Sequence, residues 1–286
     1  MRSKGATISE STRQRVLAAA HQLDYHINAA GQSLSRKRTG TIGLIVRRPL
    51  GRLSADAFLP PLIEGITSLI GPDGLRLLIE PLDIEQPVRN VALVREGHVD
   101  GLIVGVRESD STIVELYGDR VPLVLWGRIA DSGLSFVDID NTAAARPAVE
   151  HLIELGHRRI GCITNAHPDL AADEAVGRLD GYRAALGANG LTLDDRLVRH
   201  GKSDEMSGFH AMQSLLDQDL SPTAVFVASD EVALGALRAA RQANLRVPSS
   251  LSIVGFDDLP MARYVVPALT TVHVPHGKSE RLPRRC

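Results

Sequence analysis

Short apolar runs rich in β-branched residues alternate with amphipathic stretches of helical length from residue 41 onward. The runs are almost continuously apolar, which is typical of parallel strands that are covered on both faces. Seven of them are expected to form strands: Ile42–Val46, Leu75–Ile79, Gly101–Gly105, Val121–Leu125, Ile160–Ile163, Ala224–Ala228 and Ser252–Gly255. This alternation predicts an α/β fold built on parallel sheets.

The amphipathic stretches between these runs predict helices. They are Phe58–Ile70, Val88–Arg95, Thr142–Leu155, Glu174–Leu186, Met206–Leu216 and Glu231–Ala243. Asn141 is suited to cap the helix that ends at Leu155, and Gly156 stands where a C′ glycine belongs. The regular order of strand and helix predicts doubly wound sheets.

Two similar segments, Thr41–Val46 and Arg159–Thr164, each open a strand–helix–strand series. The 286 residues of the chain are enough for two domains. We therefore expect two lobes, with a ligand in the cleft between them at the carboxyl ends of the strands.

Residues 1–40 differ from this body in charge, because they carry a net charge of +5 whereas the remainder carries −7. They predict a helix over Glu10–Leu23 that is capped by Ser9, and a short helix over Ala29–Leu34 that is capped by Asn28. A basic arm on an acidic body indicates nucleic-acid binding at one end of the molecule.

Other classes of protein are disfavoured. The two cysteines, Cys162 and Cys286, provide neither a disulfide framework nor a metal motif. No apolar run approaches 18 residues and no signal-peptide pattern is present, so we expect a cytoplasmic protein without membrane contact. Nucleophile-elbow, P-loop and dinucleotide motifs are absent, so we expect neither an enzyme nor a cofactor or metal.

Motifs along most of the chain together resemble the lactose-repressor/galactose-repressor (LacI/GalR) family of transcription regulators. They are Ile8–Ala20, Asn28–Leu34, Thr41–Val46, Val149–Gly161, Arg178–Tyr182, Ala228–Gly235, Ser252–Asp258 and Pro267–Val272. The resemblance covers roughly residues 8 to 275. It implies two doubly wound parallel-sheet lobes of the periplasmic-binding-protein-like type I, preceded by a short helical remnant of a helix-turn-helix headpiece.

The resemblance also implies domain boundaries: a truncated headpiece and hinge helix over residues 1–40, a first lobe over 41–140 plus 270–286, and a second lobe over 141–269. The family has two further helices before the first one here, among them the recognition helix. Residues 276–286 resemble nothing in the family and read like a frameshifted end. We therefore expect the chain as written not to bind an operator specifically.

Two charged residues are candidates for binding an effector. The resemblance makes Asp230 an acceptor for ligand hydroxyls, although an acid before a helix also suits a cap. It makes Arg178 a ligand-binding residue whose planar donors suit a bidentate grip, the alternative being an ion pair with Glu174 on the same helix.

Three residues at predicted element ends are further effector candidates. Phe58 and Trp126 could stack on a sugar face or pack in the core, while Asp140 could contact the ligand or cap a helix. The adjacent pair Asp257 and Asp258 is assigned a turn role, because no clustered ligands support a metal site.

The DNA-binding candidates lie in the hinge and the headpiece remnant. The resemblance places Asn28, Gly31 and Gln32 in the hinge helix and makes Leu34 a wedge that enters the minor groove. Arg13 and Arg36 are expected to neutralise phosphates.

Together these features predict a ligand-responsive transcription regulator, usually a repressor, that acts as a homodimer on operator DNA in its full-length form. An effector, expected to be a sugar or a sugar derivative, would change the relative placement of the lobes. The alternatives are a sugar-binding receptor without a DNA function and a non-functional truncated regulator.

Overall fold

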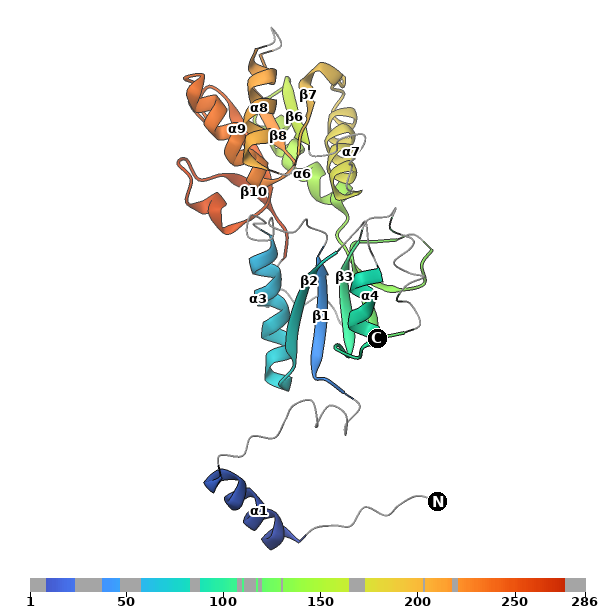
Figure 1. Cartoon of the computed structure of the whole chain (residues 1–286). Coiled ribbons are helices and arrows are strands. Elements are labelled where there is room, and N and C mark those ends of the chain that lie inside the picture. Colours follow the sequence, from blue (N-terminus) through green and yellow to red (C-terminus); the bar gives the residue numbers. More distant parts are fainter. Residues whose placement is uncertain are drawn as a thin grey trace.

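The computed structural model describes residues 9–23, 38–46, 58–82, 88–106, 110, 117, 120–129, 131–164, 173–202, 204–217 and 221–275. Figure 1 shows two α/β lobes, each with its own sheet. Strands β1 and β3 of the first lobe point their carboxyl ends toward the second lobe. Two lobes of this kind confirm the predicted fold class.

The first sheet has five parallel strands in the order β2-β1-β3-β4-β5. The strands are β1 (Thr41–Val46), β2 (Arg76–Pro81), β3 (Gly101–Gly105), β4 (Leu123–Trp126) and β5 (Ser135–Val137). Helices α3 (Leu59–Ile70) and α4 (Val88–Arg95) and the short 3₁₀ helix η2 (Gly71–Asp73) connect them. The strand β5 was not predicted, since its three side chains are all exposed.

The second sheet has the order β10-β9-β8-β6-β7 and is also parallel. Its strands are β6 (Ile160–Thr164), β7 (Val198–His200), β8 (Ala224–Val227), β9 (Ser252–Asp257) and β10 (Thr270–His273). The helices of this lobe are α6 (Asn141–Glu154), α7 (Asp173–Ala188), α8 (Glu205–Leu216) and α9 (Asp230–Gln242), with 3₁₀ helices η3 (Asp195–Leu197) and η4 (Pro260–Arg263).

Strand β10 corrects one predicted boundary. Residues 270–286 were assigned to the first lobe, yet Thr270–His273 pairs in parallel with Val254–Asp257 of β9. The reason is topological, because β10 supplies the fifth strand of the second sheet and covers the otherwise open edge of β9. Residues 276–286 lie outside the described part of the chain.

Both sheets have the same connectivity, as the similar segments at β1 and β6 predicted. When the strands of each lobe are counted from one to five, both follow the order 2-1-3-4-5. In such sheets the strand order reverses next to the first strand, and ligands bind at the carboxyl ends of the strands near that switch point. The fold therefore singles out the ends of β1 and β3 in the first lobe, and those of β6 and β8 in the second.

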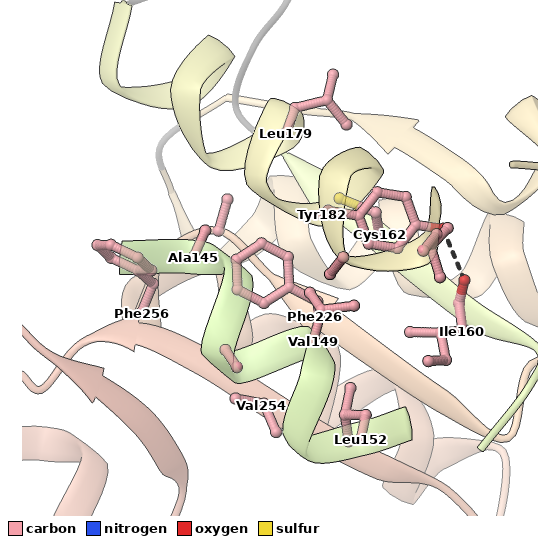
Figure 2. Packing of buried hydrophobic residues seen from close by; sticks show 14 of the residues in the cluster. Ala145, Val149, Leu152, Ile160, Cys162, Leu179, Tyr182, Phe226, Val254 and Phe256 are labelled. Carbon is pink, nitrogen blue, oxygen red and sulfur yellow. Dashed lines mark hydrogen bonds between the residues drawn. The ribbon is translucent and has the colours of Figure 1, made fainter. Parts of the chain in front are cut away.

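The second lobe has a hydrophobic core on each face of its sheet, one against helices α8 and α9 and the other against helices α6 and α7. Figure 2 shows Val149 and Leu152 of α6 beside Phe226 and Val254 of the sheet. The hydroxyl of Tyr182, which is fully buried, donates a hydrogen bond of 2.8 Å to the carbonyl oxygen of Ile160. This packing fixes α7 against the sheet and thereby fixes the side chains that α7 carries.

Helices α6 and α7 approach each other closely because α7 has glycines at the contact. A Cβ atom on Gly181 would lie 2.6 Å from the carbonyl oxygen of Thr142, and one on Gly177 would lie 2.9 Å from the Cβ of Asn141. Such distances exclude any larger side chain without a shift of the helices. The first turn of α6 is therefore held against the middle of α7.

The N-terminal helix α1 (Glu10–Gln22) agrees with the prediction, since the backbone N–H of Thr12 donates to the hydroxyl of Ser9 at 3.3 Å. Val16 of this helix and Leu23 directly after it are exposed. The predicted hinge residues Asn28, Gly31, Gln32 and Leu34, together with Arg36, lie outside the described residues.

Candidate functional site

Arg178 is the central polar side chain at the carboxyl ends of the second sheet, next to the switch point. Helix α7 carries it, and only 9% of the residue is exposed. Its Nη1 donates to the carbonyl oxygen of Ala228, which directly follows β8, at 2.6 Å, and lies 3.0 Å from Oδ1 of Asp257 at the end of β9. The guanidinium therefore bridges the carboxyl ends of two neighbouring strands.

The remaining contacts of Arg178 fix the plane of the guanidinium. Nε donates to Oδ1 of Asn141 at 3.0 Å, and Cζ lies 3.9 Å from the centre of the Phe256 ring. An arginine over an aromatic face gains cation–π attraction. Nη2 makes no hydrogen bond within the part of the chain that the structure describes. A rigid cation with two unused N–H donors suits recognition of a polar ligand.

Asp257, the last residue of β9, and Asp258, which follows it, have an unusual backbone conformation. Their φ angles are +114° and +54°, and non-glycine residues with positive φ are uncommon and concentrate at functional sites. Asp258 accepts from Nδ1 of His273 at 2.7 Å, and its backbone N–H donates to the hydroxyl of Thr271 at 3.3 Å. The turn that the sequence predicted is thus present, and it holds the Asp257 carboxylate beside Arg178.

Asp230 lies beneath this turn and is 0% exposed. Its Oδ1 accepts from the hydroxyl of Thr271 at 2.6 Å, and its Oδ2 accepts from the backbone N–H of Leu259 at 2.9 Å. Burial raises the pKa of Asp230 to about 6, with Asp257 and Asp258 adding to the effect and the two hydrogen bonds opposing it. The carboxylate therefore ties the start of α9 to β10 and to the loop after β9.

Asp230 was expected either to accept from ligand hydroxyls or to cap the following helix, and the structure shows a different set of contacts. Asp230 is the first residue of α9, and the N-cap is Ser229, which makes no side-chain cap hydrogen bond. Each Asp230 oxygen accepts from one protein donor and keeps a lone pair, but the residue is fully buried, so a ligand hydroxyl could reach it only if the surrounding loops moved. The carboxylate that lies next to Arg178 is instead that of Asp257, to which sequence reasoning assigned only a turn.

Phe58 and Trp126 form a stacked aromatic pair in the first lobe. Their ring centres are 5.3 Å apart and their planes differ by 10°. Trp126 ends β4, and Phe58 is the residue before α3. Phe58 also packs against the buried cluster of the second lobe, a cluster that includes Phe256. The pair therefore lies where the first lobe meets the hydrophobic cluster on which Arg178 rests.

Asp140, and not Asn141, caps helix α6. Asp140 is the N-cap of α6, and its Oδ1 accepts from the backbone N–H of Ala143 at 2.8 Å. Asn141 is already helical, and its side chain contacts Arg178 instead. The capping alternative for Asp140 is therefore confirmed, whereas its contact with an effector stays a prediction. The predicted Asn141 cap was wrong.

Two further features bear on the class of protein. No helix among the described residues is long and apolar enough to cross a membrane. Within the same residues, no group of three or more histidine, cysteine or acidic side chains is arranged to hold a metal ion.

Comparison with known proteins assigns the family. Residues 149–279 match the periplasmic binding protein-like domain. The HTH-type transcriptional regulator CelR of Thermobifida fusca is 35% identical over 274 residues, which cover 94% of this chain and 79% of CelR. The chain belongs to the LacI family. It is thus a ligand-responsive transcriptional regulator and not an enzyme, as its sequence predicted.

Solved structures agree with this assignment. A complex of the transcriptional regulator CelR with cellobiose superimposes with a TM-score of 0.74 at 33% identity, over 94% of this chain and 81% of that one. The Lac repressor dimer bound to operator and the anti-inducer ONPF gives a TM-score of 0.82 at 28% identity, over 95% and 81%. This LacI-family chain therefore shares its two-lobed architecture with proteins solved in complex with sugar or with DNA.

Proposed function

We propose that this regulator binds a hydroxyl-rich effector, a sugar or a sugar derivative, between the carboxyl ends of its two sheets. The observation that carries the proposal is the pairing of Arg178 with Asp257 at 3.0 Å, at the carboxyl end of β9 and beside that of β8. Together the two side chains offer N–H donors and carboxylate acceptors, and a sugar hydroxyl can use both. The cellobiose complex of CelR supports this class of ligand.

The aromatic pair of the first lobe would form the opposite wall of the site. Trp126 and Phe58 are both partly exposed, and their apolar faces suit the C–H face of a pyranose ring. A ligand that contacts Arg178 on one side and this pair on the other would bridge the lobes. The differential contact with the two lobes would let the effector favour one lobe arrangement over another.

A binding screen tests the class of effector. Thermal shift and calorimetry on the full chain would compare cellobiose, glucose, galactose and ribose with hypoxanthine as a planar, non-sugar ligand. We expect a rise in melting temperature with at least one sugar, because a ligand that binds only the folded state stabilises it. Binding of hypoxanthine alone would refute the sugar assignment.

Two substitutions test the site itself. Arg178→Lys removes the planar donors but keeps the charge, and Asp257→Asn keeps a residue that tolerates positive φ but loses the charge. Each should weaken binding of the sugar found in the screen by about tenfold or more, which corresponds to about 1.4 kcal/mol. Arg183→Lys, on the exposed face of the same helix, is the matched control and should change affinity less than twofold. Unchanged affinity in folded Arg178→Lys and Asp257→Asn variants would reject this site.

We further propose that the protein acts as a homodimer through an exposed apolar patch on the second lobe. The patch is formed by Tyr264 and Val266, which are 84% and 79% exposed. The Lac repressor, whose structure this chain resembles, was solved as a dimer on its operator. A symmetric pair of such patches would remove both side chains from water.

The oligomeric state tests this interface. Sedimentation of Val266→Asp should show monomers, because the dimer would bury the new charge. Leu155→Asp introduces the same charge at an exposed aliphatic residue outside the patch, 61% exposed, and should leave the dimer intact. A Val266→Asp dimer as stable as the wild type would exclude this patch. We also propose that the full-length form of the regulator binds operator DNA and that the protein is cytoplasmic.

A further inference from the structure

Asn141 occupies the point where the chain passes from the first lobe into the second. Residues 138–140 connect β5 to α6, and Asn141 is the first residue of that helix. Only 8% of Asn141 is exposed, although it is polar. Because Asp140 already caps the helix, the Asn141 side chain is not needed for capping. A buried amide that does not cap its helix must be satisfied in another way.

Both ends of this amide have partners. Nδ2 donates to the carbonyl oxygen of Ile139 at 3.3 Å, and Oδ1 accepts from Nε of Arg178 at 3.0 Å. The orientation of the amide follows from chemistry, since a guanidinium can only donate and a carbonyl oxygen can only accept. An amide therefore satisfies both the Ile139 carbonyl oxygen and the Arg178 Nε–H. A carboxylate cannot donate to Ile139, and an aliphatic side chain can bond to neither group.

The packing around Asn141 leaves this geometry little freedom. A Cβ on Gly177 would lie 2.9 Å from the Cβ of Asn141, so α7 passes directly over the first turn of α6. Ile139 itself packs against the hydrophobic cluster of the second lobe. The carbonyl of Ile139 is thus a fixed acceptor, and it sets the rotamer of Asn141.

We propose that Asn141 is a positioning residue that sets the direction of the Arg178 guanidinium toward the effector. The hydrogen bond to Nε leaves Nη1 for Ala228 and Asp257 and directs Nη2 away from the protein contacts. Asn141 thereby links the effector-binding arginine to the interlobe connection at Ile139. This inference rests on the proposed effector site, and it adds a residue that does not itself touch the ligand.

The first test needs no ligand. In a nitrogen-15 spectrum of the full chain, the Nε–H of Arg178, assigned by its loss in Arg178→Lys, should be protected from exchange because it is buried and bonded. Asn141→Leu, which has the same branching at Cγ but no polar atoms, should expose it to exchange, whereas Asn141→Asp should keep it protected. An unchanged Arg178 signal in Asn141→Leu would overturn the proposal.

The second test uses cellobiose as the probe. Asn141→Leu should weaken its binding by about tenfold or more, and Asn141→Asp by less, because the carboxylate still accepts from Arg178 but repels the Ile139 carbonyl. Asn189→Leu is the matched control, since the Asn189 side chain, directly after α7, donates only to the carbonyl oxygen of Ala185, at 2.9 Å. Equal losses in Asn141→Leu and Asn189→Leu would overturn the positioning role.

The two tests separate the two proposals. If wild-type protein binds none of the sugars, the assigned effector class fails, and the Arg178 signal alone decides whether Asn141 positions the guanidinium. If wild-type protein binds cellobiose and Asn141→Leu binds it equally well at an equal melting temperature, the positioning role fails while the effector site stands.

Discussion

Replacing Asp230 with asparagine should change how stability depends on pH. The folded state raises the pKa of Asp230 from its ordinary value of 3.8 to about 6, chiefly because the carboxyl group is buried. The folded protein therefore binds the proton more tightly than the unfolded chain does. This stabilisation is fully present below pH 3.8 and is lost as the pH rises through 6.

The size of the effect follows from the shift. One pKa unit corresponds to 1.36 kcal/mol, so the full contribution is about 3 kcal/mol, and about 1 kcal/mol of it falls between pH 5 and pH 7. Asparagine at position 230 is neutral in both the folded and the unfolded state, so the variant does not lose this stability as the pH rises. The free energy of unfolding of Asp230→Asn, relative to wild type, should thus improve by about 1 kcal/mol from pH 5 to pH 7.

Urea unfolding followed by circular dichroism is the appropriate assay. Fluorescence would report the wrong lobe, because the single tryptophan, Trp126, lies in the first sheet whereas Asp230 lies in the second. Asp180→Asn removes one exposed carboxylate from the same lobe and controls for the change in net charge. Parallel pH profiles of wild type and Asp230→Asn would refute the reasoning, since they would mean that Asp230 does not titrate in this window.

Three substitutions test the framework of the second lobe by urea unfolding. Asp140→Ala should destabilise it by about 1 kcal/mol through loss of the α6 cap, and an unchanged midpoint would reject that role. Gly181→Val should cost about 1–3 kcal/mol, because the side chain collides with the carbonyl oxygen of Thr142; a neutral effect would mean that α6 and α7 can separate freely. Tyr182→Phe should cost about 1 kcal/mol by removing the hydrogen bond to Ile160, and a stabilised variant would contradict this.

The central strands and the helices between them were predictable because burial on both faces gives a parallel strand a continuous apolar run. The edge strands β5 and β7 lack that signal. Each is three residues long, the side chains of Ser135–Val137 are exposed, and β7 contains an arginine and a histidine. Such segments become strands because a neighbouring strand offers hydrogen bonds, and that neighbour is known only from the folded sheet.

The site was predicted only in part for a similar reason. The family resemblance singled out Arg178, but its partners Asn141 and Asp257 lie 37 positions before it and 79 after it. Local pattern also could not decide which of Asp140 and Asn141 caps α6, because both residue types are good caps. The non-helical backbone of Asp140, with ψ of 89°, decides it in the structure.

The positive φ angles at the end of β9 restrict how the protein could acquire a new effector specificity. At +114°, position 257 disfavours branched and bulky side chains, whose cost there is on the order of 1–3 kcal/mol. Glycine and asparagine are the replacements that the backbone tolerates best, and both remove the charge opposite Arg178. In a mutational search for altered ligand preference, we therefore expect survivors to keep aspartate, asparagine or glycine at this position. Most of the variation should instead accumulate on the first lobe, at Phe58 and Trp126 themselves, because neither residue has a positive φ angle.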